Sequence, residues 1–384
     1  MPLRLLYVSH SLPPPGRPLA NVGGMQRVAT ELHAALQAHP EVQLSSLVLR
    51  SSWRWTHLRV LPFGASLLWR IPALVRRERI EVVLFYSMVT ASLAIPLRRR
   101  VRALGARLVA IANGLDVTLP VGAYQRFVPR VFAALDAVVP ISRATGAECL
   151  QRGLPPRKLH VIPCGVDPER FPSAPEDCSA ARRVLLDDLG ASLPENTLLL
   201  CSVGRLVERK GVAWFVERVM PLLPPEVHYW VAGEGPMHEA VEEAIARHGL
   251  QRRVRLLGLV PEETLIRLYR EADLFVMPNI PVPGDMEGFG VVMLEAGLCG
   301  LPTVAARLEG IQDVIAEGEN GHLVTSGDAA AFAQAILRYH RNPEALAAAS
   351  ARATRRVMES FTWRAVADEY VRFLAGPARV AELG

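Results

Sequence analysis

The chain is poor in lysine, in cysteine and in long apolar stretches. Only Lys158 and Lys210 among its 43 basic residues are lysine; the others are arginine. Its five cysteines are odd in number and lack the paired spacing of a zinc site, which predicts reduced thiols and a cytoplasmic protein. No stretch reaches the roughly 18 consecutive apolar residues of a membrane-spanning helix. The first residues also lack the apolar core of a secretion signal.

What the chain does contain points to a large globular protein. It has 384 residues, half of them hydrophobic, which is enough for two domains with sizeable cores. The formal net charge of +5 would suit partners that carry phosphate or anionic lipid. Nucleic acid is not an expected partner, because no nucleic-acid-binding motif is present and few aromatic residues accompany the basic ones.

Apolar, β-branched runs alternate with helical patterns along the chain, as in parallel sheets covered on both faces. Strands are expected at 3–8, 42–49, 81–86, 107–112, 137–141, 159–163, 197–203, 227–232, 254–258, 273–277 and 302–306. Helices are expected at 24–38, 66–79, 125–135, 211–220, 237–248, 262–271, 291–299, 329–338 and 361–374. We therefore predict an α/β fold of two doubly wound, Rossmann-like domains facing across a cleft.

Two glutamates frame a glycine-rich turn in the second half of the chain. Glu287 and Glu295 are separated by seven residues. The turn between them begins with Gly288, Phe289, Gly290 and Val291. Glycine lets the backbone approach a ligand closely, and the amides of the helix start that follows favour an anion. The motif predicts a nucleotide sugar, with its diphosphate at the helix start and its hydroxyls on the carboxylates.

Two cations follow the first strand of the second domain. Arg205 and Lys210 lie five residues apart on a loop ahead of a helix. Arginine can hold phosphate oxygens in a fork, and lysine adds a point charge. If a diphosphate leaves during the reaction, both would stabilise the charge that develops on it. Salt bridging at the surface is the alternative, and the rarity of lysine in this chain argues against it.

Further strand-to-helix turns could contact the same ligand. The candidate donor-binding residues at these turns are Gly23, Gly24, Asn113, Gly233, Leu257 and Val260. Asn113 could hydrogen-bond a sugar hydroxyl, and the turn after 254–258 could hold a nucleobase through its backbone. Each also has a plain structural interpretation as a tight turn or a connection. Asn320-Gly321 predicts a hairpin turn.

Taken together, the motifs resemble a known family. GGMQR, SVGRL with RKG, AGEGP, EGFGVVMLEA and ENGHLV occur in this order over nearly the whole chain. The set is similar to the retaining glycosyltransferases of family four, which have the GT-B fold. The resemblance implies transfer of a sugar from a nucleotide-sugar donor, UDP-linked by preference and GDP-linked as second choice, with retention of anomeric configuration. No obligatory metal and no cofactor are expected.

The resemblance also implies roles for residues and domains. Arg205 and Lys210 would bind the diphosphate, Glu287 the donor sugar and Glu295 the ribose. Residues 1–168 would form an acceptor-binding domain, 169–195 a linker, and 196–360 the donor-binding domain. The helix within 361–384 would pack back onto the first domain; plain packing is its alternative interpretation.

The chain departs from the family pattern at three places. Asn113 replaces a histidine, and asparagine cannot shuttle a proton. Glu309 replaces the first of two glycines and could reshape the sugar pocket, and Cys164 replaces an asparagine of the domain exit turn. No Asp-x-Asp metal motif is present, and Asp285-x-Glu287 is better explained by a sugar contact. The leaving phosphate oxygen is the expected base, in a front-face mechanism.

The acceptor side is expected in the first domain. Residues 51–80 mix tryptophan with arginine, and 96–107 add more arginine, a composition typical of helices at a membrane surface. This pattern favours a lipid-linked or cell-envelope acceptor and peripheral contact with the inner face of a membrane. The alternative is a sheet-covering helix with a solvated arginine face. Two other functions stay open: another GT-B enzyme, such as an epimerase or phosphorylase, and a non-catalytic subunit that binds sugar nucleotides.

Overall fold

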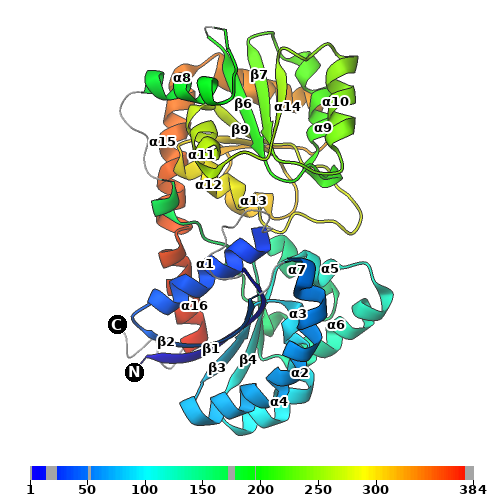
Figure 1. The fold of residues 1–384 in the computed structure, drawn as a ribbon, viewed down its shortest axis with the longest axis vertical. Helices are drawn as coiled ribbons and strands as arrows, with labels where there is room; N and C mark the ends of the chain where they lie inside the picture. The colour runs from blue at the N-terminus through cyan, green and yellow to red at the C-terminus, as the bar shows by residue number, and fades with distance from the viewer. Residues whose placement is uncertain (1, 14–23, 51–52, 172–177, 195, 377–384) are drawn as a thin grey trace. The chain divides into compact units, whose positions relative to one another are not determined.

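The computed structural model describes residues 2–13, 24–50, 53–171, 178–194 and 196–376. The chain divides into two compact units (Figure 1). Unit 1 consists of Met1–Val166 and Phe361–Gly384, and unit 2 consists of Asp167–Ser360. The chain therefore leaves unit 1 once, builds unit 2 from a continuous segment, and returns to unit 1.

Unit 1 is built on a five-stranded parallel sheet. Its strands are β1 (Leu3–Leu12), β2 (Val42–Arg50), β3 (Val82–Phe85), β4 (Arg107–Ala112) and β5 (Ala137–Pro140). They lie in the order β2-β1-β3-β4-β5, and each neighbouring pair is parallel. β3 and β5 are buried along their whole length, as continuous apolar runs predict for strands covered on both faces.

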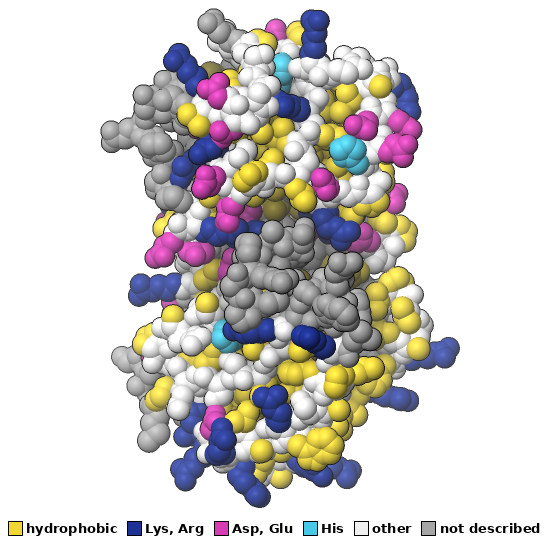
Figure 2. Space-filling model, viewed as in Figure 1, with side chains coloured by type: hydrophobic (Ala, Val, Ile, Leu, Met, Phe, Trp, Pro, Cys, Tyr) yellow, Lys and Arg dark blue, Asp and Glu magenta, His cyan; other side chains and the backbone are white. Residues whose placement is uncertain are grey.

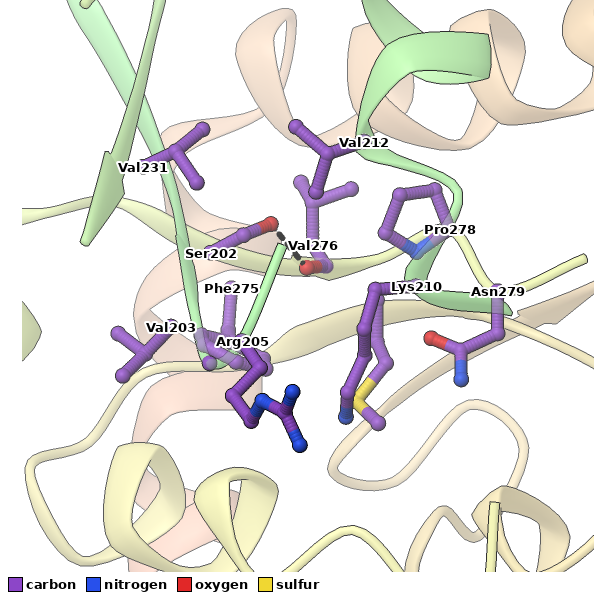
Figure 3. Close-up of a pocket in the computed structure, with 12 residues that line it drawn as sticks. Ser202, Val203, Arg205, Lys210, Val212, Val231, Phe275, Val276, Pro278 and Asn279 are labelled. Carbon is purple, nitrogen blue, oxygen red and sulfur yellow. Dashed lines mark hydrogen bonds between the residues drawn. The ribbon is translucent and has the colours of Figure 1, made fainter. Parts of the chain in front are cut away.

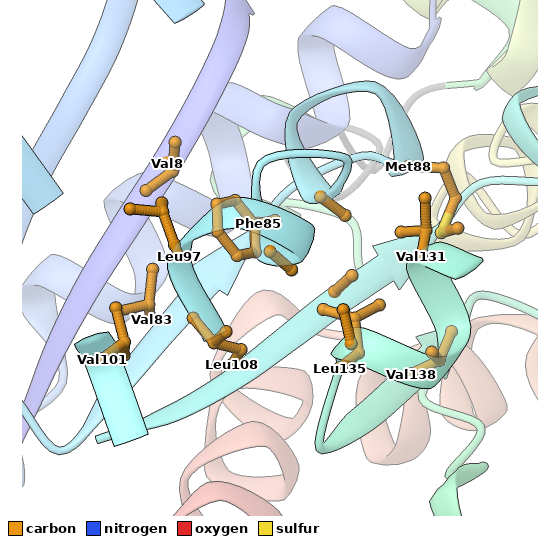
Figure 4. Close-up of a cluster of buried hydrophobic side chains, with 14 of the residues drawn as sticks. Val8, Val83, Phe85, Met88, Leu97, Val101, Leu108, Val131, Leu135 and Val138 are labelled. Carbon is orange, nitrogen blue, oxygen red and sulfur yellow. The ribbon is translucent and has the colours of Figure 1, made fainter. Parts of the chain in front are cut away.

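Helices cover both faces of this sheet (Figure 1). They are α1 (Gly24–Ala38), α2 (Trp53–Glu78), α3 (Met88–Ala91), α4 (Ala94–Ala103), α5 (Leu115–Thr118), α6 (Gly122–Ala134), α7 (Arg143–Gln151) and α16 (Trp363–Ala375). α1 packs against α16, whereas α4 packs against both α2 and α6. Figure 4 shows the core beneath α4 and α6, where Phe85 and Leu108 of the sheet meet Leu97 and Val131 of the helices.

The helix α16 is a structural part of unit 1 although it lies at the far end of the chain. Its buried side chains are Trp363, Val366, Ala367, Tyr370, Val371 and Leu374. The Thr362 hydroxyl caps its first turn by accepting the Ala365 amide at 3.2 Å. The indole of Trp363 donates to Glu31 of α1 at 2.7 Å, and the amide of Val166 donates to the Phe361 carbonyl at 2.8 Å.

Unit 2 contains a six-stranded sheet in which all neighbouring strands are parallel. Its strands are β6 (Leu198–Val203), β7 (Val227–Ala232), β8 (Val254–Gly258), β9 (Leu274–Met277), β10 (Thr303–Ala306) and β11 (Gly321–Val324). Their order is β11-β10-β9-β6-β7-β8, so the direction of winding reverses between β6 and β9. This is the strand order of a doubly wound nucleotide-binding sheet.

Unit 2 also has helices on both faces of its sheet (Figure 1). They are α8 (Cys178–Asp188), α9 (Val212–Arg218), α10 (His238–Arg247), α11 (Glu262–Glu271), α12 (Val292–Leu298), α13 (Ile311–Val314), α14 (Ala329–His340) and α15 (Pro343–Ser360). α8 packs on α11, and α12 packs on α15. On the other face, the ring of Phe215 in α9 lies 4.8 Å from that of Tyr229 in β7, measured between centroids.

Several elements differ from those expected. The segment 159–163 runs beside β5 through the amides of His160 and Ile162, yet it joins the sheet only by an isolated bridge at Leu159. The hairpin predicted at Asn320-Gly321 is wrong, because β11 pairs in parallel with β10. Asn320 instead closes the turn between α13 and β11 by accepting the Ala316 amide and donating to the Val314 carbonyl.

Other differences concern helices. α2 begins at Trp53, earlier than the expected 66, and contains Pro62 and Pro72 in its interior. α7 and α15 were not expected, and α4 was expected only as part of the arginine-rich segment 96–107. α8 lies within the expected linker 169–195 and packs into unit 2. Among the helices of the described residues, none is both long and apolar enough to cross a bilayer.

Candidate active site

A pocket lies in unit 2 where the strand order reverses. Ligands of doubly wound sheets bind at such a reversal, beyond the carboxyl ends of the strands. The pocket is lined by Ser202, Val203, Gly204, Arg205, Lys210, Val212, Val231, Phe275, Val276, Met277, Pro278 and Asn279. Figure 3 shows Arg205 and Lys210 extending toward the same side of the strand ends. The structure therefore brings together the two cations singled out from the sequence.

The loop after β6 places Lys210 beside the end of β9. Glu208–Lys210 form one turn of 3-10 helix, which ends at Gly211 with a φ of 65°. A Cβ at Gly211 would lie 2.0 Å from the Pro278 carbonyl oxygen, so only glycine permits this close approach. The amide of Ile280 donates to the Arg209 carbonyl at 3.0 Å and ties the two segments together.

Three nitrogens converge on one carboxylate oxygen of Glu287, which is 7% exposed. Lys210 Nζ lies 2.6 Å from Glu287 Oε2. Asn279 Nδ2 donates to the same oxygen at 3.2 Å, and Arg209 Nε lies 3.6 Å from it. Arg209 Nη1 also lies 3.3 Å from Asp285 Oδ2. A lysine and a glutamate that were assigned to different parts of a ligand are thus partners in the protein itself.

These contacts decide the ionisation of Glu287. Burial opposes the charged carboxylate, but the positive charges of Lys210 and Arg209 and the hydrogen bonds from Lys210 and Asn279 outweigh it, so the pKa of Glu287 is lowered. The side chain is therefore an anion at neutral pH. A carboxylate held in this way can accept hydrogen bonds but is a poor proton donor.

Glu309 supports the backbone of the same turn. Its carboxylate accepts the amide of Glu287, and the amide of Gly310 donates to the Glu287 carbonyl at 3.2 Å. Glu309 has a φ of 46°, in the left-handed region that side chains rarely adopt. Burial, together with the negative charge of Glu287, raises the pKa of Glu309. Glu309, which stands where the family has a glycine, therefore has a strained backbone conformation and lies next to another negative charge.

Glu295 occupies a different environment from Glu287. It lies in α12, is 2% exposed, and its Oε2 accepts the hydroxyl of Tyr269 at 3.0 Å. Burial and the negative charge of Glu295 raise the pKa of Tyr269, so the tyrosine stays a hydroxyl donor. In the preceding turn Phe289 is 2% exposed, while Gly288 and Val291 are half-buried. The predicted ribose contact of Glu295 stays a prediction.

The remaining candidates of unit 2 lie at the ends of neighbouring strands. Gly233 follows β7 with a φ of 137°, and a Cβ there would lie 2.0 Å from the Gly204 carbonyl oxygen. Position 233 therefore requires a glycine, because the ends of β6 and β7 pack closely against each other there, beside Arg205. Leu257 and Val260 are half-buried at the end of β8, two strands away from β6. No contact of theirs ties them to the pocket, and their role stays a prediction.

The candidates of unit 1 are Asn113, Gly24 and Gly23. Asn113 donates its side-chain amide to the Tyr86 carbonyl at 2.9 Å and to Asp116 Oδ2 at 3.3 Å. The Asp116 carboxylate accepts hydrogen bonds from the amides of Asn113 and Met88. Because Asn113 follows β4 and Met88 follows β3, Asp116 joins the ends of these two strands. Gly24 is the exposed first residue of α1, and Gly23 lies outside the described residues.

The acidic side chains near the pocket are matched by cations. Arg209 contacts both Asp285 and Glu287. Among the described residues, no group of three or more His, Cys, Asp or Glu side chains could hold a metal ion. Two contributors to the site, Arg209 and Asn279, were missed from the sequence. Their signals were present: Arg209 precedes Lys210, and Asn279 lies two residues past the last residue of β9 at the reversal.

The fold and the site define a doubly wound α/β protein with two cations at its strand reversal, and the comparisons with known proteins agree. A family model described as "Glycosyltransferase Family 4" matches residues 22–170, and one described as "Glycosyl transferases group 1" matches residues 197–342. Together these matches account for most of the chain. The chain belongs to the family-four glycosyltransferases.

Two relatives in sequence are sugar-transferring enzymes by name. The amylovoran biosynthesis glycosyltransferase of Erwinia amylovora is 30% identical over 70% of this chain, which spans 64% of that protein. The GDP-mannose-dependent alpha-(1-6)-phosphatidylinositol monomannoside mannosyltransferase of Mycolicibacterium smegmatis is 29% identical over 80% of this chain and 79% of that protein.

Solved structures share the fold. HepE of Anabaena, determined in complex with UDP, aligns with a TM-score of 0.74 at 19% identity over 97% of this chain and all of that one. Sucrose-phosphate synthase of Thermosynechococcus elongatus aligns with a TM-score of 0.73 at 20% identity over the full length of both chains. These likenesses show the GT-B fold.

Proposed function

We propose that the protein is a retaining glycosyltransferase that moves a sugar from a nucleotide-sugar donor to a glycan or lipid-linked acceptor. The observation that carries the proposal is the pocket at the strand reversal of unit 2, where Arg205 and Lys210 line the ends of β6 and β9 and Lys210 contacts Glu287. The cations suit a diphosphate, and the anionic carboxylate suits the hydroxyls of a sugar attached to it. Family membership supports the same function.

The chemistry assigned to these residues is electrostatic. Negative charge builds on the leaving diphosphate as the bond to the sugar breaks, and Arg205 and Lys210 stabilise that charge in the transition state. Glu287 orients the sugar and is not the base, because its pKa is lowered and its Oε2 is already occupied. A leaving phosphate oxygen takes the acceptor proton in a front-face reaction. Neither metal nor cofactor is required, so turnover should persist in EDTA.

The donor is proposed to be a UDP-sugar, with a GDP-sugar as second choice. HepE binds UDP, while the mycobacterial relative depends on GDP-mannose by name. A thermal-shift panel of UDP-, GDP- and ADP-sugars decides between them. A donor at 100 times its dissociation constant should stabilise the protein by about 2.7 kcal/mol. Stabilisation by none of the panel would contradict the proposal.

Transfer itself is tested by product release. With the donor found in the panel, nucleoside diphosphate should accumulate only when an acceptor is present. Release without acceptor that leaves a modified sugar would instead favour the epimerase or phosphorylase alternative. Binding without any release would favour a non-catalytic subunit.

The acceptor is proposed to be a cell-envelope glycan or its lipid-linked precursor, reached at the inner face of the membrane. On unit 1, Trp69 and Leu61 of α2 are 70% and 80% exposed, and Arg70, Arg76 and Arg77 on the same helix are also exposed. Figure 2 shows apolar and basic side chains gathered over α2 and α4. This combination suits an anionic bilayer surface, where apolar groups enter and arginines meet headgroups.

A further inference from the structure

Asn279 is a buried polar residue that lines the pocket. It follows β9 at the strand reversal and is 1% exposed. Its backbone is fixed because the Ser326 hydroxyl donates to the Asn279 carbonyl at 2.7 Å. Its side-chain Nδ2 donates to Glu287 Oε2 at 3.2 Å. The reverse orientation of the amide would set two oxygens against each other, so this contact defines which end of the side chain is the acceptor.

The other end of this amide has no partner among the residues that the structure describes. Asn279 Oδ1 is buried and accepts no hydrogen bond from any described residue. Buried polar atoms are paired in nearly all native structures, and an orphaned acceptor in a ligand pocket points to a donor supplied by the ligand. Asn279 lines the same pocket as Arg205 and Lys210 (Figure 3).

The chemistry of the acceptor limits what it can bind. An amide oxygen cannot bond a phosphate oxygen, because neither carries a proton at neutral pH. It requires a hydroxyl or an N–H group. A ligand that satisfies both the cations and this acceptor therefore has a hydroxyl or an N–H group close to its phosphates. The sugar of a glycosyl diphosphate supplies such hydroxyls, whereas inorganic diphosphate has neither group.

We propose that Asn279 reads the transferred sugar: Oδ1 accepts a hydroxyl of the donor sugar while Nδ2 holds Glu287 beside it. The inference rests on the proposed function and names a recognition residue for it. It also explains how Lys210 can turn from Glu287 to a phosphate. Asn279 and Arg209 contact the same carboxylate oxygen and would remain its partners if Lys210 moved to a phosphate.

Isothermal titration of matched ligand pairs tests the proposal. The probes are UDP-glucose against UDP, and GDP-mannose against GDP, because each pair differs by the sugar alone. Asn279→Ala and Asn279→Ser should weaken the nucleotide sugar about 5- to 100-fold. They should change the affinity for the nucleoside diphosphate less than about threefold, because the phosphate contacts of Arg205 and Lys210 are kept.

Asn320→Ala is the matched control. Asn320 is a buried asparagine of the same unit, 5% exposed, whose two side-chain groups are both paired with backbone. This variant should lower the melting temperature. It should not weaken binding of the nucleotide sugar more than binding of the nucleoside diphosphate. The serine variant at 279 keeps a small polar group should the alanine variant fold poorly.

The outcomes separate the inference from the proposed function. A wild-type protein that binds neither nucleotide sugar contradicts both. If the wild type binds but Asn279 variants lose nucleotide sugar and nucleoside diphosphate equally, or lose neither, only the inference is overturned. The same is true if Asn320→Ala produces the same split.

Discussion

Lys210 makes the shortest of the contacts that stabilise the negative charge of Glu287, with Nζ at 2.6 Å from Oε2. Lys210→Met would leave a carboxylate that is 7% exposed with only Arg209 and Asn279 as partners. We expect the free energy of unfolding at pH 7 to fall on the order of 3 kcal/mol, since one partner of a nearly buried pair is removed. Urea denaturation followed by circular dichroism measures this.

The control for this prediction is the double variant Lys210→Met with Glu287→Gln. It removes both charges and should recover most of the lost stability, because the cost lies in the unpaired anion and not in the missing contact. A double variant as unstable as the single one would show that the pair is not what holds the turn.

Activity should respond to the same two positions in different ways. Lys210→Ala removes a cation from the leaving group and should lower both donor affinity and kcat, the latter by about 10²- to 10³-fold. Glu287→Gln should keep nucleoside diphosphate affinity and lose turnover. Steady-state kinetics with the donor found in the thermal-shift panel measure both. Near-normal turnover of Glu287→Gln together with unchanged donor affinity of Lys210→Ala would refute the roles.

Glu309 makes a prediction about pH. Burial and the charge of Glu287 raise the pKa of Glu309 in the folded protein. Such a carboxyl stabilises the fold below its unfolded pKa, and that stabilisation is lost as pH rises through the higher folded pKa. Glu309→Gln still offers an oxygen to the Glu287 amide and should therefore be more stable than the wild type at pH 8. The gain should vanish near pH 4.

Thermal unfolding of the two proteins between pH 4 and pH 8 measures this difference. Equal melting temperatures at pH 8 would show that the charge on Glu309 is not costly. The pKa of Glu287 shifts the other way, so its contribution to stability is present above its unfolded pKa and is lost as pH falls through the folded one. As the pH falls, protonation of Glu287 therefore removes a stabilising contribution to the fold, whereas protonation of Glu309 removes a destabilising one.

From the sequence, Lys210 and Glu287 could be predicted as site residues, whereas their partners Arg209 and Asn279 could not. Lys210 stood out because lysine is nearly absent, and Glu287 because glycines flank it. Arg209 was hidden among 41 arginines, and Asn279 belongs to no motif. Their role depends on β6 and β9 being neighbours, and a strand order that joins the first and fourth strands cannot be read from local spacing. Nor could spacing reveal that Lys210 and Glu287 pair with each other.

At the scale of elements, α2 combines buried and exposed apolar side chains on one helix. Ile71 is fully buried in the core of unit 1, whereas Trp69 is 70% exposed. Trp69→Ser should therefore leave the melting temperature nearly unchanged. Ile71→Ala should lower the free energy of unfolding by about 2–5 kcal/mol, as large-to-small changes in a core do.

The two variants also separate membrane contact from packing. Trp69→Ser should reduce co-sedimentation with anionic vesicles, and high salt should reduce it further by screening the arginines. Ile71→Ala, if folded at the assay temperature, should bind as the wild type does. Wild-type protein that shows no salt-sensitive binding would rule out the membrane surface, and α2 would then be a sheet-covering helix with a solvated face.

The strands were easier to predict than the helices for a physical reason. Runs of mostly apolar residues such as 82–85 and 227–232 are buried on both faces, and a run of this kind and length is best explained as a strand inside a covered sheet. Four arginines interrupt the apolar residues of α4, and α2 contains two prolines in its interior. α7 had a readable signal, because the Ser142 hydroxyl accepts the Thr145 amide at its start.

At the scale of the whole molecule, the two units differ in how the chain composes them. Unit 2 is the continuous segment Asp167–Ser360, whereas unit 1 needs Phe361–Gly384 as well. A fragment 167–360 should unfold cooperatively in a thermal melt. A fragment 1–166 lacks the buried face of α16 and should bind a hydrophobic dye and aggregate. Cooperative unfolding of fragment 1–166 would contradict this account.

The division at Val166 and Phe361 has a consequence for how the protein is made. Synthesis usually lets the N-terminal domain fold first. Here the strands of unit 1 leave the ribosome early but wait for α16, which follows the whole of unit 2 along the chain. The tryptophan that seals unit 1 against Gly165 arrives after some 200 intervening residues, so the surface it covers is exposed for the whole of that interval. A chaperone that binds nascent chains should therefore be found on unit 1 and not on unit 2.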